Sequence, residues 1–138
     1  MVTLYKSEFA KHEFDESTST LFTTWLPETE NMTAALFKSE MQEWLNAFCD
    51  CSPKYLYDAC NEFLYPITPD EQIWMAHLLN PEFVLRGLKK YAHMVPADMI
   101  TEMSVDQLFG EYFAMNLPNQ YPIINFAKRQ DALDWLYS

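Results

Sequence analysis

Residues 55–60 read Tyr-Leu-Tyr-Asp-Ala-Cys, and this stretch decides the fold class. Its length and its β-forming residues predict a short strand. The strand is apolar on both faces, which is typical of the centre of a mainly parallel sheet that helices cover on both sides. Because parallel neighbours need a crossover connection, the segments before and after this strand should be helices.

Both flanking segments carry helical signals. From Met32 to Cys51 the apolar residues recur on one helical face, and Ser52-Pro53 ends that helix. Thr68-Pro-Asp-Glu71 predicts the start of the next helix, because Thr68 can cap it and Glu71 can reach back to the Thr68 amide. We expect this helix to run over residues 69–79, with a second helical turn over 81–86 that Gly87 ends.

The same alternation continues towards both ends of the chain. Two strands before the first helix should form an antiparallel hairpin with its turn in residues 15–18. The strands predicted outside the central stretch are 4–14, 21–26, 89–95 and 121–126. The remaining helical predictions are a short helix or turn over 98–103, a helix to about Met115 opened by a capping box at Ser104-Val-Asp-Gln107, and a helix over 127–137. The order β-β-α-β-α-β-α-β-α predicts one α/β domain over residues 1–138, with a mixed, mainly parallel sheet of four to five strands flanked by helices.

Composition and charge exclude several classes of protein. Among 138 residues 49% are hydrophobic and 16% aromatic, so the chain should bury one hydrophobic core, and no apolar run reaches the roughly 20 residues of a membrane span. The net charge of -11 repels phosphate backbones, so nucleic acid is not an expected partner. The first residues lack the pattern of a secretory signal, and we expect a cytoplasmic protein.

Common catalytic and cofactor motifs are missing from the sequence. Gly87 and Gly110 are the two glycines, which leaves neither a phosphate-binding loop nor a dinucleotide fingerprint nor a nucleophile elbow. The spacing of Cys49, Cys51 and Cys60 fits no zinc ribbon or redox motif, so reduced thiols are expected. The sequence therefore predicts no cofactor and no metal, and an enzyme is the less favoured class.

Asp58 is the strongest polar candidate for a site. At the end of a central parallel strand it should lie at the carboxyl edge of the sheet, where ligands of open α/β sheets bind. Its carboxylate can equally accept backbone amides of residues 61–65, which would make its role structural. The aromatic and methionine side chains exceed the needs of a small core, so some should line a pocket or an interface, unless they simply form an aromatic core. The ligand or interaction candidates are Asp58, Phe63, Trp74 and Met94.

Several short segments of the sequence, in this order, resemble those of a known family. They are Trp25 with Met32-Thr33 and Phe37-Lys38, Pro53 to Asp58, Ile67 to Trp74, Gly87 to Pro96, Ser104 to Gln107, and Ala132 to Leu136. Together they resemble the SpoIIAA-like, or STAS-like, family related to anti-sigma-factor antagonists and STAS/SEC14-type domains, in particular small stand-alone bacterial members of the Bacteroidetes type. The resemblance covers residues 21–136. It implies a four- or five-stranded mixed sheet that acts as a docking module or binds an apolar or nucleotide-like ligand. Asp58-Ala59-Cys60-Asn61 stands where that family has its phosphorylated Ser or Thr, so the resemblance does not carry a phosphorylation switch to this chain.

These observations leave three hypotheses on function. The leading one is a non-enzymatic regulatory or protein-interaction module, in which the helices after Asp58 and after Pro96 contact a protein partner or a second copy in a homodimer. The alternative is a small-molecule binder whose pocket near the four candidate side chains holds a lipid-like, aromatic or nucleotide-like ligand. The weakest is an enzyme that uses Asp58 with His77 or His93 as an acid–base pair.

Overall fold

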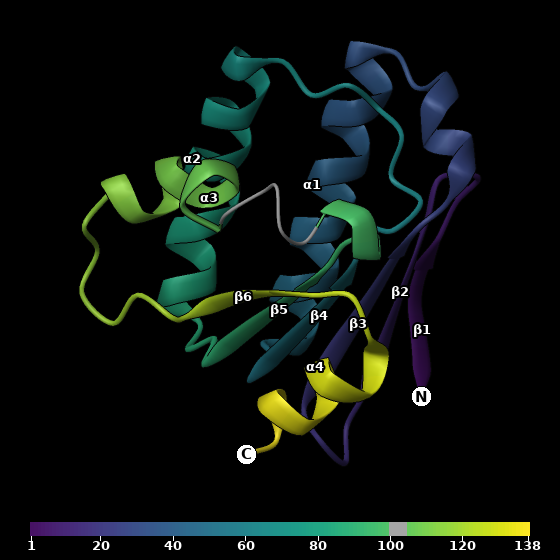
Figure 1. Cartoon of the computed structure of the whole chain (residues 1–138). Coiled ribbons are helices and arrows are strands. Elements are labelled where there is room, and N and C mark those ends of the chain that lie inside the picture. Colours follow the sequence, from purple (N-terminus) through teal and green to yellow (C-terminus); the bar gives the residue numbers. More distant parts are fainter. Residues whose placement is uncertain (100–104) are drawn as a thin grey trace.

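The chain folds around one six-stranded mixed sheet with the strand order β1-β2-β3-β4-β5-β6 (Figure 1). The computed structural model describes residues 1–99 and 105–138. The strands are β1 (Val2–Lys6), β2 (Ala10–Asp15), β3 (Thr20–Trp25), β4 (Tyr55–Ala59), β5 (Lys90–Met94) and β6 (Ile123–Phe126). The α-helices in the described residues are α1 (Ala34–Cys51), α2 (Pro69–Leu85), α3 (Val105–Ala114) and α4 (Arg129–Leu136), and the 3-10 helices are η1 (Pro27–Asn31) and η2 (Ala97–Met99).

The sheet is antiparallel at one side and parallel at the other. β1, β2 and β3 pair antiparallel, and β3 to β6 pair parallel. Because each parallel strand lies beside the one before it in sequence, right-handed crossovers bring their helices to the same face of the sheet. The α/β class with a mixed sheet flanked by helices is therefore confirmed.

Alternation along the strands divides the apolar side chains between two cores. Leu21, Leu56 and Tyr91 face α1, α2 and α3 in the larger core. Their neighbours in sequence, among them Phe22 and Tyr57, face the other side, where the smaller core contains Ala132 and Leu136 of α4. Since successive strand residues point to opposite faces, this pattern confirms that the central strand is covered on both sides, with three helices on one face and one on the other.

The first predicted strand, residues 4–14, is wrong as a single element. It is divided into β1 and β2 by a turn in which Ser7 Oγ accepts hydrogen bonds from the amides of Phe9 and Ala10, at 3.0 and 3.2 Å. Ser7 in turn donates to the Glu40 carboxylate of α1. Such local side-chain hydrogen bonds compete with the backbone hydrogen bonds between strands and favour a turn. Because the predicted strand is divided in two, the sheet has six strands and not the four or five expected. The hairpin that joins β2 to β3, with its turn between Asp15 and Thr20, is as predicted.

α2 is longer than the sequence predicts. A helix was expected to end near Leu79 ahead of a separate turn, but α2 continues through Pro81 to Leu85. Proline weakens a helix interior, and the full burial of Leu79 and Phe83 on either side of it holds the helix together here. Gly87 follows with a φ of 82°, which is the left-handed conformation expected at a helix end.

Two predictions concern the segment before α3. η2 occupies Ala97–Met99, and α3 begins at Val105. The capping box predicted at Ser104, and the rest of the expected 98–103 segment, lie outside the described residues. Within the part of the chain that the structure describes, no helix has the length and apolar character needed to cross a membrane.

The capping box predicted at the start of α2 is present. Thr68 Oγ1 accepts from the Glu71 amide at 3.2 Å, and the Glu71 carboxylate accepts from the Thr68 amide at 3.0 Å. We expect Thr68→Ala to lower the free energy of unfolding by about 1 kcal/mol, because the Glu71 amide in the first turn loses its side-chain acceptor. Urea unfolding measures the change. Thr68→Ser keeps the hydroxyl and is the control; an equal loss in both variants would contradict the capping argument.

Candidate functional site

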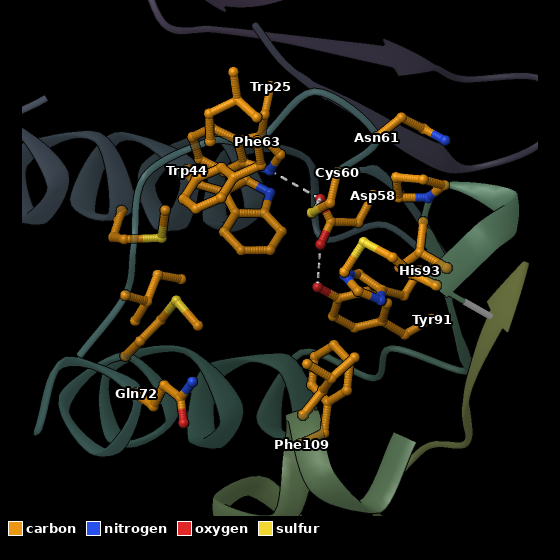
Figure 2. A pocket seen from close by; sticks show the side chains of 18 residues that line it. Trp25, Trp44, Asp58, Cys60, Asn61, Phe63, Gln72, Tyr91, His93 and Phe109 are labelled. Carbon is orange, nitrogen blue, oxygen red and sulfur yellow. Dashed lines mark hydrogen bonds between the residues drawn. The ribbon is translucent and has the colours of Figure 1, made fainter. Parts of the chain in front are cut away.

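A cavity of about 280 Å³ lies at the carboxyl ends of β3, β4 and β5, between the sheet and helices α1 to α3 (Figure 2). Parallel pairing brings the ends of these strands to one edge. In the register of β4 and β5, Asp58 lies directly beside His93. Trp25 at the end of β3 completes this wall. The carboxyl edge is the expected position of a ligand site in an open α/β sheet.

Aromatic and methionine side chains form most of the cavity wall. The rings of Trp25 and Trp44 meet edge to face with centroids 5.5 Å apart, and Phe63 meets Trp25 in the same way at 5.5 Å. Met41 of α1 and Met75 of α2 also line the cavity. Edge-to-face aromatic pairs stabilise one another beyond the area that they bury, so this wall is well packed around a space that stays open.

Asp58 is the centre of the polar part of the cavity. Its carboxylate is 3% exposed and accepts hydrogen bonds from Trp25 Nε1 at 2.9 Å, from Cys60 Sγ at 3.2 Å, and from the Tyr91 hydroxyl (Figure 2). Among the described residues its partners are side chains, and not the amides of 61–65 that the structural alternative required. A buried carboxylate held by three side-chain donors is a feature of the pocket rather than of the following loop.

Two of these donors are held in their protonated forms. Burial raises the pKa of the Cys60 thiol well above 9, and the neighbouring Asp58 charge raises it further. Burial and the same charge raise the pKa of Tyr91 well above 10. At neutral pH, Cys60 is therefore a thiol that faces the cavity as a hydrogen-bond donor, and it is not an activated nucleophile.

His93 lies on β5 next to Asp58 with one ring nitrogen engaged. Its Nδ1 is 2.9 Å from Oδ1 of Asn125 in β6, so Nδ1 donates to that oxygen, and Nε2 is the acceptor of the ring in its neutral form. The ring meets Phe109 of α3 edge to face, with centroids 5.1 Å apart. The Asn125 side chain and the Phe109 ring thus fix the orientation of the His93 ring.

The geometry bears on the acid–base hypothesis. A ring nitrogen of His93 lies within 4.8 Å of both a carboxylate oxygen of Asp58 and Sγ of Cys60. No direct hydrogen bond joins His93 to Asp58 in the described parts of the chain, although a single water can bridge such a separation. His77 is exposed on α2 and is not among the lining residues. His93 is therefore the histidine that Asp58 can reach.

The structure brings together two of the four candidate residues. Asp58 and Phe63 line the cavity. Trp74 lies outside it, beneath the Lys38 ammonium at 5.3 Å from the ring centroid. Met94 is buried in the smaller core against α4, because it alternates with His93 along β5 and points to the opposite face.

Sequence reasoning missed Trp25 and Cys60 as partners of Asp58, and it named His93 only in the weakest hypothesis, as an alternative to His77. Two weak signals were present. Trp25 lies near the end of a predicted strand, and Cys60 follows Asp58 at the two-residue spacing that places both on one face. His93 had no local signal, because its position beside Asp58 depends on the register between two strands 35 residues apart in sequence.

The fold and the cavity define a class: an α/β domain with a mainly parallel sheet and an aromatic pocket at its carboxyl edge. No protein-family model matches the chain, and no curated protein or solved structure matches it either. The function therefore has to be argued from the pocket itself.

Proposed function

We propose that this protein binds a small, uncharged and mainly apolar organic molecule in the cavity at the carboxyl ends of β3, β4 and β5. The observation that carries the proposal is the convergence of aromatic walls and one compact polar cluster on a single cavity of about 280 Å³. Small-molecule sites combine these features, because apolar walls supply affinity and a few placed polar groups fix the orientation.

The volume limits the size of the ligand. An apolar cavity of about 150 Å³ accepts benzene, so about 280 Å³ suits one aromatic ring with substituents. Both Met41 and Met75 can adapt their shape to such a ring, because methionine side chains are flexible and polarizable. A long lipid chain would have to extend beyond the cavity.

The polar cluster favours a ligand that donates a hydrogen bond. Asp58 Oδ2 accepts a hydrogen bond from Tyr91, and the Nδ1 bond of His93 to Asn125 leaves Nε2 as the acceptor of the neutral ring. A hydroxyl or amine group on the ligand would match both acceptors. No described lining residue is Lys or Arg, and the buried Asp58 carboxylate repels anions. Of the alternatives predicted from sequence, an aromatic ligand is therefore favoured over a nucleotide.

Native mass spectrometry of the protein as purified tests the proposal first, because it detects a retained ligand as extra mass. Titration with single-ring phenols and aromatic amines follows, with tryptophan fluorescence as the signal. Trp25 and Trp44 line the cavity, so occupation should change their emission. A protein that retains no small molecule and gives no response to any of these compounds would rule the proposal out.

Filling the cavity with protein should abolish binding. We expect Leu108→Trp, on the α3 wall, to weaken the best ligand by at least about tenfold, because the larger ring occupies space that the ligand needs. Ile73→Trp is the matched control, since Ile73 is 42% exposed on α2 and does not line the cavity. Fluorescence titration compares the two variants after circular dichroism has established that both fold. Unchanged affinity in Leu108→Trp would place the ligand elsewhere.

A regulatory or interaction module of STAS-like type stays as a second proposal. It is supported by the order of the elements, by the phrases quoted above, and by apolar side chains on the surface, such as Leu64 at 50% and Ile73 at 42% exposure. Exposed apolar groups close to one another are common at protein interfaces. In the same native mass spectra, a dimer without extra mass would favour this proposal over a ligand-binding role.

A further inference from the structure

Three side chains at the polar end of the cavity offer three different metal-binding atoms. A carboxylate oxygen of Asp58, Sγ of Cys60 and a ring nitrogen of His93 all lie within 4.8 Å of one another. We propose that these three residues bind a divalent transition-metal ion, with Zn²⁺ the best match to an oxygen, sulfur and nitrogen donor set.

The distances between the three ligand atoms are close to those found around a bound metal ion. Zinc bonds of about 2.0–2.3 Å in a tetrahedral arrangement place the ligand atoms roughly 3.3–3.8 Å apart. Cys60 Sγ and Asp58 Oδ1 are already 3.2 Å apart. A ring nitrogen of His93 therefore has to approach the other two ligand atoms by at most about 1–1.5 Å.

Charge balance supports a divalent cation. On binding, the S–H bond of Cys60 breaks, its proton leaves to solvent, and the thiolate sulfur forms a bond to the metal. The Cys60 thiolate and the Asp58 carboxylate then contribute two negative charges, and neutral His93 contributes none. Two anionic ligands neutralise one divalent ion, so the occupied site buries no net charge. The net charge of -11 on the chain also attracts cations at long range.

The groups around the three ligands hold them as metal sites require. The Nδ1 proton of His93 is donated to Oδ1 of Asn125, which leaves Nε2 for the metal. Trp25 Nε1 and the Tyr91 hydroxyl donate to the two oxygens of Asp58 and orient the carboxylate. A second layer of hydrogen bonds to histidine and carboxylate ligands is a general feature of metal sites, because it fixes the tautomer and the orientation.

The cavity supplies the remaining coordination position. Figure 2 shows Asp58, Cys60 and His93 on one side of the open space that Trp44, Phe63 and Phe109 enclose. Three protein ligands with an open fourth position are typical of zinc sites that bind water or an exogenous ligand. The other two cysteines, Cys49 and Cys51, end α1 and are not part of this group of ligand atoms.

Cobalt titration tests the proposal. Co²⁺ replaces Zn²⁺ in such sites, and a bond to thiolate produces a sulfur-to-metal charge-transfer band in the near ultraviolet. The reduced protein, freed of metal by a chelator, should bind one Co²⁺ with this band, and Zn²⁺ should displace it. Cys60→Ser and His93→Gln should each weaken binding by at least about tenfold.

Cys51→Ser and His77→Gln are the matched controls, because they change the same residue types outside the cluster. Both should bind Co²⁺ as the wild type does. If Cys60→Ser does not fold, X-ray absorption of the zinc-loaded wild type must show one sulfur at about 2.3 Å beside nitrogen and oxygen ligands. Co²⁺ binding without a charge-transfer band, or binding that Cys51→Ser abolishes and Cys60→Ser does not, would overturn the proposal.

Discussion

Replacing Asn80 with alanine should lower the free energy of unfolding by about 3 kcal/mol, since each buried polar group left without a partner costs about 1–3 kcal/mol. Asn80 is fully buried on α2. Its Nδ2 donates to the Tyr112 carbonyl oxygen at 3.1 Å and to Gln120 Oε1 at 3.0 Å, and its Oδ1 accepts from the Tyr121 hydroxyl at 2.6 Å. This one side chain joins α2 to α3 and to the segment before β6. Alanine supplies none of these bonds and leaves the Tyr112 carbonyl and the Tyr121 hydroxyl without this partner.

Urea unfolding of Asn80→Ala and wild type measures this loss as a shift in midpoint at an unchanged slope. Asn46→Ala is the matched control, because Asn46 also lies in a helix, α1, but is exposed, and its side chain accepts a hydrogen bond from Gln42 Nε2 at 3.1 Å. Both variants gain the same helix propensity from alanine, so the difference between them isolates the buried network. A loss of less than about 0.5 kcal/mol in Asn80→Ala would show that the network is not needed for stability.

The second large effect is a loss of stability in acid that comes from His12. This side chain is fully buried in β2, between the rings of Tyr5 and Trp44, and its Nδ1 is 3.1 Å from Thr23 Oγ1. Burial lowers the pKa of His12 from 6.5 to about 4. Between these two values the unfolded chain binds the proton more readily than the folded one, so stability falls as the pH falls. Protonation of His12 does not affect the free energy of unfolding above about pH 6.5. As the pH falls from there to about 4, it lowers this free energy by about 3 kcal/mol.

Urea unfolding at a series of pH values from 7 to 4 measures this effect. Carboxylates titrate in the same range, so the quantity to compare is the difference in slope between wild type and His12→Gln, in which the side chain cannot be protonated. His77→Gln is the control, because His77 is exposed and its removal should leave the wild-type slope. The same pH dependence in His12→Gln and wild type would refute the assignment, as would a titration of the His12 ring protons near pH 6.5 in the folded protein.

Features of the fold that depend on neighbours in sequence could be predicted. The capping box of Thr68 and Glu71, the end of α2 at Gly87, and the strand over 55–59 all follow from short patterns. The position of Asp58 at the carboxyl edge also follows, because a strand between two crossover helices has its direction set by the chain. Each of these inferences needs only a few adjacent residues.

The errors occurred where distant residues decide the local structure. Ser7 turns the chain with the help of Glu40, which lies 33 residues away on α1. Pro81 stays within α2 because Leu79 and Phe83 are buried against other elements. In both places tertiary contacts outweighed a local preference, and a single sequence does not reveal such contacts.

The candidate site, like the fold, has features that the local sequence predicts and features that only the tertiary structure decides. By itself the sequence determined an α/β domain of alternating elements, with Asp58 at the edge where a ligand would bind, because hydrophobic periodicity and capping are local properties. Only the tertiary structure decided that Trp25, Cys60 and His93 surround Asp58 and that Met94 does not. The reason is strand register: a shift by one residue between β4 and β5 would exchange His93 for Met94 at the pocket, and the register is set by the packing of both sheet faces.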